Sequence, residues 1–132
     1  MDRIGSMEYE ELTSAILECS FEVAKELGTV YERVLIVALS QRGLAVEAQR
    51  PLRVMFRGVI AGDFFADLVV ENKVLVELKA VTRILNEHKA QVINYLNATG
   101  ITVGLLIDFG TPRIEYFRLR PSVHPADPVH PV

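Results

Sequence analysis

Three charged side chains stand inside an otherwise apolar stretch, residues 64–80. Asp67 lies in the first apolar run, and Glu77 and Lys79 lie in the second. The polar residues 71–73 separate the two runs. Runs rich in β-branched and aromatic residues around a short polar turn are typical of a β-hairpin. The charges are therefore expected on two neighbouring strands.

The length of the turn decides how these charges meet. A three-residue turn makes Val70 face Val74, and counting outward places Asp67 directly opposite Glu77. Directly opposed residues have Cβ atoms roughly 5 Å apart on one face of the sheet. Side chains alternate along a strand, so Lys79 shares the face of Glu77. A two-residue turn would shift the register by one and separate the carboxylates.

Two opposed carboxylates repel each other, and something must compensate their charge. A divalent cation held by Asp67 and Glu77 would do so, with the ammonium of Lys79 beside it. The alternative is that Lys79 forms a salt bridge with one carboxylate on a solvated face. The triplet alone leaves both interpretations open.

A predicted helix over residues 86–99 carries a second polar pair. Gln91 and Tyr95 are four residues apart and therefore lie on one face of this helix. Gln91 could hydrogen-bond a phosphate or orient Lys79. A solvent-facing glutamine beside a partly buried tyrosine is the alternative.

The remaining chain predicts a single α/β domain. Hydrophobic periodicity and breaker residues predict these elements: helices over residues 8–27, 30–42 and 86–99, with Asn86 and Gly100 as caps of the last, and strands over residues 44–49, 52–60, 101–107 and 112–119 in addition to the hairpin. Pro51 is expected to break a strand or to lie at a sheet edge. We expect residues 1–7 to be a start or cloning remnant, residues 8–120 to form the domain, and residues 121–132 to be a Pro-rich disordered tail.

Composition narrows the class of protein. The chain has 132 residues, of which 50% are hydrophobic, and a net charge of −3, so it can fold as one globular domain. No apolar run approaches the ~20 residues of a membrane span. A single cysteine, Cys19, excludes an intramolecular disulfide and favours a cytoplasmic protein. Residues 31–58 contain five arginines and two glutamates; this basic segment could follow phosphates or form an ordinary solvated surface.

The conjunction of these motifs resembles a known family. Asp67, then Glu77-Leu78-Lys79, then Gln91-x-x-x-Tyr95 is similar to the PD-(D/E)XK nuclease superfamily, in its branch with a Gln-x-x-x-Tyr motif like that of the RecB-type nucleases. The similarity is closer still to small bacterial and archaeal proteins called the GxxExxY family. It runs from residue 15 to residue 119 and includes residues 23–28, 30–32, 66–70, 76–80, 90–96 and 105–110.

The resemblance implies a restriction-endonuclease-like core, a central mixed β-sheet flanked by α-helices. It implies a metal-dependent nuclease that acts on DNA. It also implies a homodimer, since many small members of the superfamily are dimers. Asp67, Glu77 and the backbone carbonyl of Leu78 would hold Mg²⁺ or Mn²⁺. Lys79 would position or help deprotonate the attacking water. Gln91 would orient Lys79 or the phosphate, and Tyr95 would support the helix face or contact the nucleic-acid backbone.

The chain departs from the family pattern at two places. Ala66 stands where the superfamily has a proline. If Tyr31 is the tyrosine of the Gly-x-x-Glu-x-x-Tyr signature, residues 27–30 are shorter than usual and the signature glutamate has no counterpart. A neighbouring acid (Glu22, Glu26 or Glu32) could replace it. The alternative function is a catalytically impaired nuclease-fold module that binds nucleic acid or a protein partner; a purely structural domain is the third.

Overall fold

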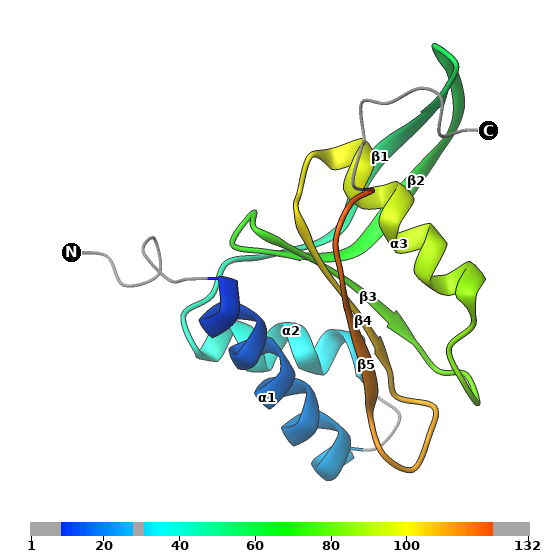
Figure 1. Cartoon of the computed structure of the whole chain (residues 1–132). Helices are drawn as coiled ribbons and strands as arrows, with labels where there is room; N and C mark the ends of the chain where they lie inside the picture. Colours follow the sequence, from blue (N-terminus) through cyan, green and yellow to red (C-terminus); the bar gives the residue numbers. More distant parts are fainter. Residues whose placement is uncertain (1–8, 28–30, 123–132) are drawn as a thin grey trace.

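The computed structural model describes residues 9–27 and 31–122, with the backbone alone for residues 25–27. Its elements follow in this order (Figure 1): α1 (Tyr9–Leu27), α2 (Glu32–Gln41), β1 (Val46–Phe56), β2 (Val59–Val70), β3 (Val74–Lys79), α3 (Asn86–Thr99), β4 (Val103–Asp108) and β5 (Glu115–Leu119). The predicted N-terminal remnant and residues 123–132 of the predicted tail lie outside the described residues. No helix in the described part of the chain is long and apolar enough to span a membrane.

The five strands form one mixed sheet in the order β1-β2-β3-β4-β5. Neighbouring strands are antiparallel except β3 and β4, which pair in parallel. Parallel neighbours need a crossover connection, and α3 supplies it between β3 and β4. The predicted α/β fold, a central mixed sheet flanked by helices, is therefore confirmed.

Helices cover both faces of the sheet (Figure 1). One core cluster joins α1 and α2 to one face, through residues such as Ile16 and Leu35 against Val76 and Leu105. The second joins α3 to the opposite face, through Val92, Tyr95 and Leu96 against residues including Leu75 and Leu106. β3 and β4 are therefore buried on both sides, which explains why their sequences read as continuous apolar runs.

Pro51 does not divide two strands. The predicted strands 44–49 and 52–60 are wrong in their limits, because β1 runs unbroken through Pro51 and the chain turns back at Arg57 and Gly58. β1 is an edge strand, where a missing backbone N–H costs no ladder hydrogen bond. Arg57 and Gly58 have φ of +54° and +79°. Positive φ at both central residues is the geometry of a tight hairpin turn that matches strand twist.

α3 is fixed at both ends by polar contacts. Its N-cap is Leu85, not the predicted Asn86, and Nδ1 of His88 accepts a hydrogen bond of 2.9 Å from the Leu85 N–H. The predicted cap at Gly100 is confirmed: φ is +79° and its N–H donates to the Leu96 carbonyl. Gly104 of β4 lets the helix pack closely, since a Cβ there would lie 2.9 Å from a methyl carbon of Val92.

Candidate functional site

The hairpin register brings the two predicted carboxylates together. Val70 pairs with Val74, as a turn over residues 71–73 predicted, and the β2–β3 ladder ends at the pair Leu68–Val76. At the next position, hydrogen bonds from backbone to side chains take the place of the backbone ladder bonds. Oε2 of Glu77 accepts the Asp67 N–H at 2.8 Å, and Oδ2 of Asp67 accepts the Leu78 N–H at 2.8 Å. Each carboxylate therefore binds the backbone of the opposite strand.

The alternation of side chains along β2 is interrupted at Asp67, so that even-numbered residues lie on opposite faces of the sheet before and after it. Before this residue, the even-numbered Ala66 lies in the core cluster under α3. After it, Leu68 lies in the cluster under α1 and α2, and the odd-numbered Val69 lies under α3. Across from Asp67, Gln49 of β1 has φ of +53° and forms no ladder pair, although the residues on either side do. This kink frees the Asp67 N–H for the Glu77 carboxylate.

Burial dominates the electrostatics of Glu77. The residue is 4% exposed. Burial and the negative charge of Asp67 raise the pKa of Glu77 to about 8, against the partial compensation of the Asp67 N–H and of Lys79. A buried carboxyl beside a second carboxylate is the environment that penalises the charged form most. Glu77 is therefore stabilised by a proton, or by a cation beside it.

Lys79 ends β3 two residues beyond Glu77, on the same side of the strand. Its backbone is clamped to the end of β4. The Phe109 N–H donates to the Lys79 carbonyl at 2.8 Å. A Cβ on Gly110 would lie 2.4 Å from the backbone nitrogen of Val81, so only glycine permits this close approach. The chain on both sides of Lys79 is thus held against the loop that follows β4.

Asp108 is the site residue that sequence reasoning missed. It is fully buried and pairs in register with Lys79. Its Oδ1 accepts the N–H groups of Val81 at 3.0 Å and Gly110 at 2.8 Å. Among buried side-chain polar atoms in the described residues, its Oδ2 alone has no hydrogen-bond partner. The aspartate followed by Phe-Gly at the end of an apolar strand was the available signal.

Helix α3 adds the predicted Gln91 and Tyr95 to this side of the sheet. Tyr95 is 6% exposed, and its ring lies 6.0 Å from the ring of Phe64. Burial raises the pKa of the Tyr95 phenol, as do the nearby charges of Glu77 and Asp67, while a side-chain hydrogen bond with Gln91 lowers it. The structure therefore places the packed Tyr95 near the carboxylate pair and the half-buried Gln91 beside Tyr95.

A further carboxylate lies near the site. Three acids were predicted as replacements for a signature glutamate, and among those whose side chains are described, Glu32 is the one whose charge raises the pKa of Glu77. It begins α2 and accepts a hydrogen bond of 2.9 Å from Gln49. The adjacent Tyr31 stacks on Phe109, with ring centroids 4.7 Å apart, which ties this helix start to the loop after β4. Glu22 pairs instead with Arg42 at 3.3 Å, and the side chain of Glu26 lies outside the described residues.

The donor set suits a divalent cation only in part. In the described chain, no group of three histidine, cysteine or acidic side chains converges as a metal site. Asp67 and Glu77 each use one oxygen to accept a backbone N–H. A cation between them would offset the repulsion that raises the pKa of Glu77. Two carboxylates can hold Mg²⁺ when water and phosphate complete its shell.

Comparison of the sequence with known protein families identifies one match. The sequence profile of the PD-(D/E)XK nuclease superfamily matches residues 10–119. The chain belongs to this superfamily. The match spans the hairpin with Asp67, Glu77 and Lys79 and the helix with Gln91 and Tyr95. No curated protein matches the chain.

A solved structure supports the fold of this superfamily member. The crystal structure of SSO0001 is similar to it, with a TM-score of 0.56 and 21% sequence identity. The similarity covers 92% of this chain and 63% of the SSO0001 chain, so this chain spans less than two thirds of that protein. At this identity the likeness shows a common fold and nothing about substrate.

Proposed function

We propose that this protein is a metal-dependent nuclease that hydrolyses phosphodiester bonds in DNA. The observation that carries the proposal is the pair of opposed carboxylates, Asp67 and Glu77, joined through reciprocal backbone hydrogen bonds at the end of the β2–β3 ladder. Lys79 follows on the same side of β3. Membership in a nuclease superfamily agrees with this chemistry.

Asp67 and Glu77, with the carbonyl of Leu78, would hold the metal ion. Hard oxygen ligands suit Mg²⁺ or Mn²⁺, and Glu32 is the nearest candidate for an additional carboxylate. When bound, such an ion polarises the phosphate and lowers the pKa of a coordinated water. The raised pKa of Glu77 means that the residue must lose a proton before it can serve as a ligand.

The chain's own residues then divide the remaining tasks. Lys79 positions the attacking water and balances negative charge that develops on the phosphate. The clamp between the ends of β3 and β4 fixes the backbone from which Lys79 extends. Gln91 orients Lys79 or a phosphate oxygen, and Tyr95 holds Gln91 in place from the buried face of α3.

A cleavage assay with Mg²⁺ or Mn²⁺ tests the proposal on single- and double-stranded DNA. Lys79→Ala should lower the cleavage rate by ~10²–10⁴-fold, the usual contribution of a positioned acid–base group, while circular dichroism shows an intact fold. Lys73→Ala, in the turn of the same hairpin, is the matched control and should cleave like the parent protein. Cleavage that survives Lys79→Ala would refute the mechanism.

The second candidate function is a nuclease-fold module that binds nucleic acid or a protein partner without cleaving it. The lack of a third converging metal-binding side chain in the described residues favours it, as does the short sequence segment 27–30, of which residues 28–30 lie outside them. It predicts binding with no turnover at any Mg²⁺ or Mn²⁺ concentration. Detectable cleavage that depends on Lys79 would exclude it.

We also infer a homodimer, a cytoplasmic location and membership of the GxxExxY family. The exposed outer side of the β1–β2 hairpin supports self-association, since it presents Met55 and Ile60 beside the Arg53–Asp63 ion pair. Opposite charges on an apolar surface can pair with their own copies across a two-fold axis. Light scattering in solution tests the dimer; a monomer at all concentrations would exclude it.

A further inference from the structure

The hairpin of β1 and β2 extends beyond the body of the sheet as an arm, here residues 50–66 (Figure 1). The side of the arm that faces α3 carries large apolar side chains in contact with solvent. Phe56 is 55% exposed, Val59 66% and Phe64 39%. Buried Leu52 lies on the same side, nearer the sheet. We call this side, with Phe56, Val59 and Phe64, the inner face of the arm.

The register fixes these residues on one side. Phe56 pairs directly with Val59, and Leu52 pairs with Phe64, so each pair points the same way. The ring of Phe64 lies over Gly62, where a Cβ would be 2.8 Å from a ring carbon. Gly62 therefore leaves room for a flat ring to lie along the arm.

The inner face continues directly into the candidate site. The Phe64 ring lies 6.0 Å from the ring of Tyr95, at an angle of 39°. Tyr95 in turn hydrogen-bonds Gln91 and lies near the carboxylates of Asp67 and Glu77. A nucleotide adjacent to a phosphate at the carboxylate pair would consequently meet Phe64 first and Phe56 further out.

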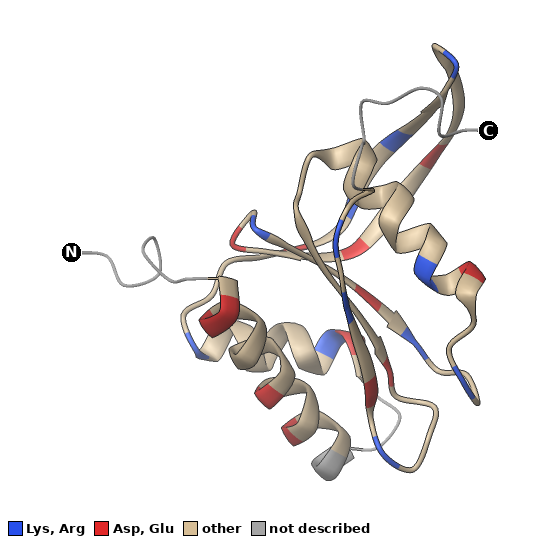
Figure 2. Cartoon of the chain, viewed as in Figure 1, with Lys and Arg blue, Asp and Glu red and all other residues tan. Residues whose placement is uncertain are grey.

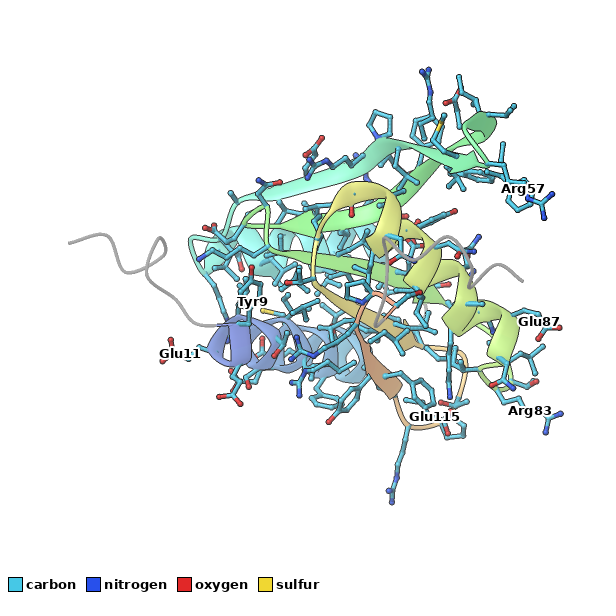
Figure 3. All side chains as sticks on the ribbon, turned by 45° about the horizontal axis from the view of Figure 1, so that its top comes forward. Tyr9, Glu11, Arg57, Arg83, Glu87 and Glu115 are labelled. Atoms are coloured by element: carbon cyan, nitrogen blue, oxygen red, sulfur yellow. The ribbon has the colours of Figure 1, made fainter. Side chains whose placement is uncertain are left out.

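The arm is basic in an acidic protein. Its residues include three arginines, Arg50, Arg53 and Arg57, against Asp63 alone, whereas the whole chain has a net charge of −3 (Figure 2). Arg57 projects from the tip of the arm (Figure 3), and its guanidinium carbon lies 4.8 Å from the centroid of the Phe56 ring. An exposed aromatic ring beside an arginine can stack a base and contact its phosphate.

We propose that the inner face of the arm binds unpaired nucleotides by stacking, so that the substrate of the neighbouring site is single-stranded nucleic acid. The inference rests on the proposed nuclease function for its link to cleavage. Bases in a duplex are stacked on each other and hide their faces, whereas unpaired bases offer them to aromatic side chains. The positive charge of Arg57 at the tip suits the negative charge of a phosphate backbone that runs past the exposed rings.

Two phenylalanines of equal exposure provide a matched test. Phe56 lies on the inner face and Phe65 on the outer face, and both are 55% exposed. Binding of a fluorescent single-stranded DNA oligonucleotide is measured by anisotropy in EDTA, with the same sequence as duplex DNA and as single-stranded RNA for comparison. Phe56→Ala should weaken single-strand binding by roughly 5- to 150-fold, the loss of one base–aromatic stack. Phe65→Ala should leave it unchanged.

The outcomes separate this inference from the nuclease proposal. Equal losses in both variants, a preference for duplex, or an unchanged affinity in Phe56→Ala would overturn the stacking face. Dimer dissociation in Phe56→Ala, with no change in oligonucleotide affinity, would assign the inner face to a second copy and likewise overturn it. Cleavage in Mn²⁺ is measured on the same variants: cleavage of duplex alone would refute single-strand selection and retain the nuclease. Selective single-strand binding without cleavage would retain the stacking face and refute the nuclease.

Discussion

Asp67 and Glu77 each accept a backbone hydrogen bond from the strand of the other, at 2.8 Å in both directions. This exchange holds two carboxylates together where the ladder between β2 and β3 has ended. Hydrogen bonds to the charged form lower a carboxyl pKa, yet burial and mutual repulsion prevail at Glu77 and raise its pKa to about 8. The site is therefore arranged to take up a proton or a cation.

The stability of the metal-free protein should fall as pH rises. Below about pH 4.5 Glu77 is protonated in both states; above it the unfolded chain releases a proton that the folded chain keeps until about pH 8. Ionisation of the buried group can cost up to about 5 kcal/mol of unfolding free energy across this window. Urea unfolding in EDTA at several pH values measures it.

Glu77→Gln is the control for that pH dependence. The variant has no proton to lose at this position, so its unfolding free energy should vary less between about pH 5 and pH 8 than that of the parent. The difference between the two proteins isolates Glu77 from other titrating groups. Parallel curves for parent and variant would contradict the raised pKa.

Metal affinity should depend on pH in the opposite sense. Glu77 must ionise to act as a ligand, so the affinity for Mn²⁺ should rise about tenfold per pH unit up to roughly pH 8 and then level off. Each binding event in this range should release a proton. Calorimetry in two buffers of different ionisation enthalpy measures that proton; affinity independent of pH would show that Glu77 is not a ligand.

The clamp behind Lys79 should tolerate no side chain at Gly110. Gly110→Ala places a Cβ against the Val81 backbone, which cannot yield as a side-chain tip can, and should cost about 1–3 kcal/mol of stability. Gly58→Ala, at the arm tip, meets no atom within 4 Å but has φ of +79°. Thermal unfolding of both separates the clash from backbone strain; a larger loss in Gly58→Ala would contradict the clamp.

Arg57 should contribute to binding through charge. If it contacts a phosphate of single-stranded nucleic acid, Arg57→Gln should reduce the slope of log affinity against log salt by about 0.7. Arg53→Gln is the comparison, since Arg53 already pairs with Asp63 at 3.0 Å. Titrations over a range of NaCl concentrations measure both slopes. A smaller change for Arg57 than for Arg53 would place the phosphate elsewhere.

Local pattern was sufficient for much of the fold and for the centre of the site. The turn over residues 71–73 determines the register, with Val70 opposite Val74, that brings Asp67 and Glu77 together. Helical spacing placed Gln91 and Tyr95 on one face of α3, and the structure has them in contact. These inferences succeeded because turn length and periodicity are local properties of the sequence.

Other features depend on contacts between distant segments. Pro51 left a strand break and an edge position open, and the strand order decides for the edge, where β1 continues unbroken. The change of face at Asp67 lies across from Gln49, whose positive φ cannot be predicted from the residue type. Asp108 became recognisable as a clamp only once β4 lay in register with β3. The exposed arm likewise follows from the length of two paired strands.

Titration with Mn²⁺ by calorimetry, above about pH 8 where Glu77 is ionised, shows whether the carboxylates of Asp67 and Glu77 bind a metal ion. The comparison is between the parent protein, Asp67→Asn and Asp63→Asn; Asp63 is an exposed aspartate of the same strand. Asparagine can still accept the Leu78 N–H, so the fold is preserved while the charge is removed. We expect Mn²⁺ to bind to the parent protein and to Asp63→Asn, and binding to be lost in Asp67→Asn. Equal binding by all three proteins, or none by the parent, would contradict it.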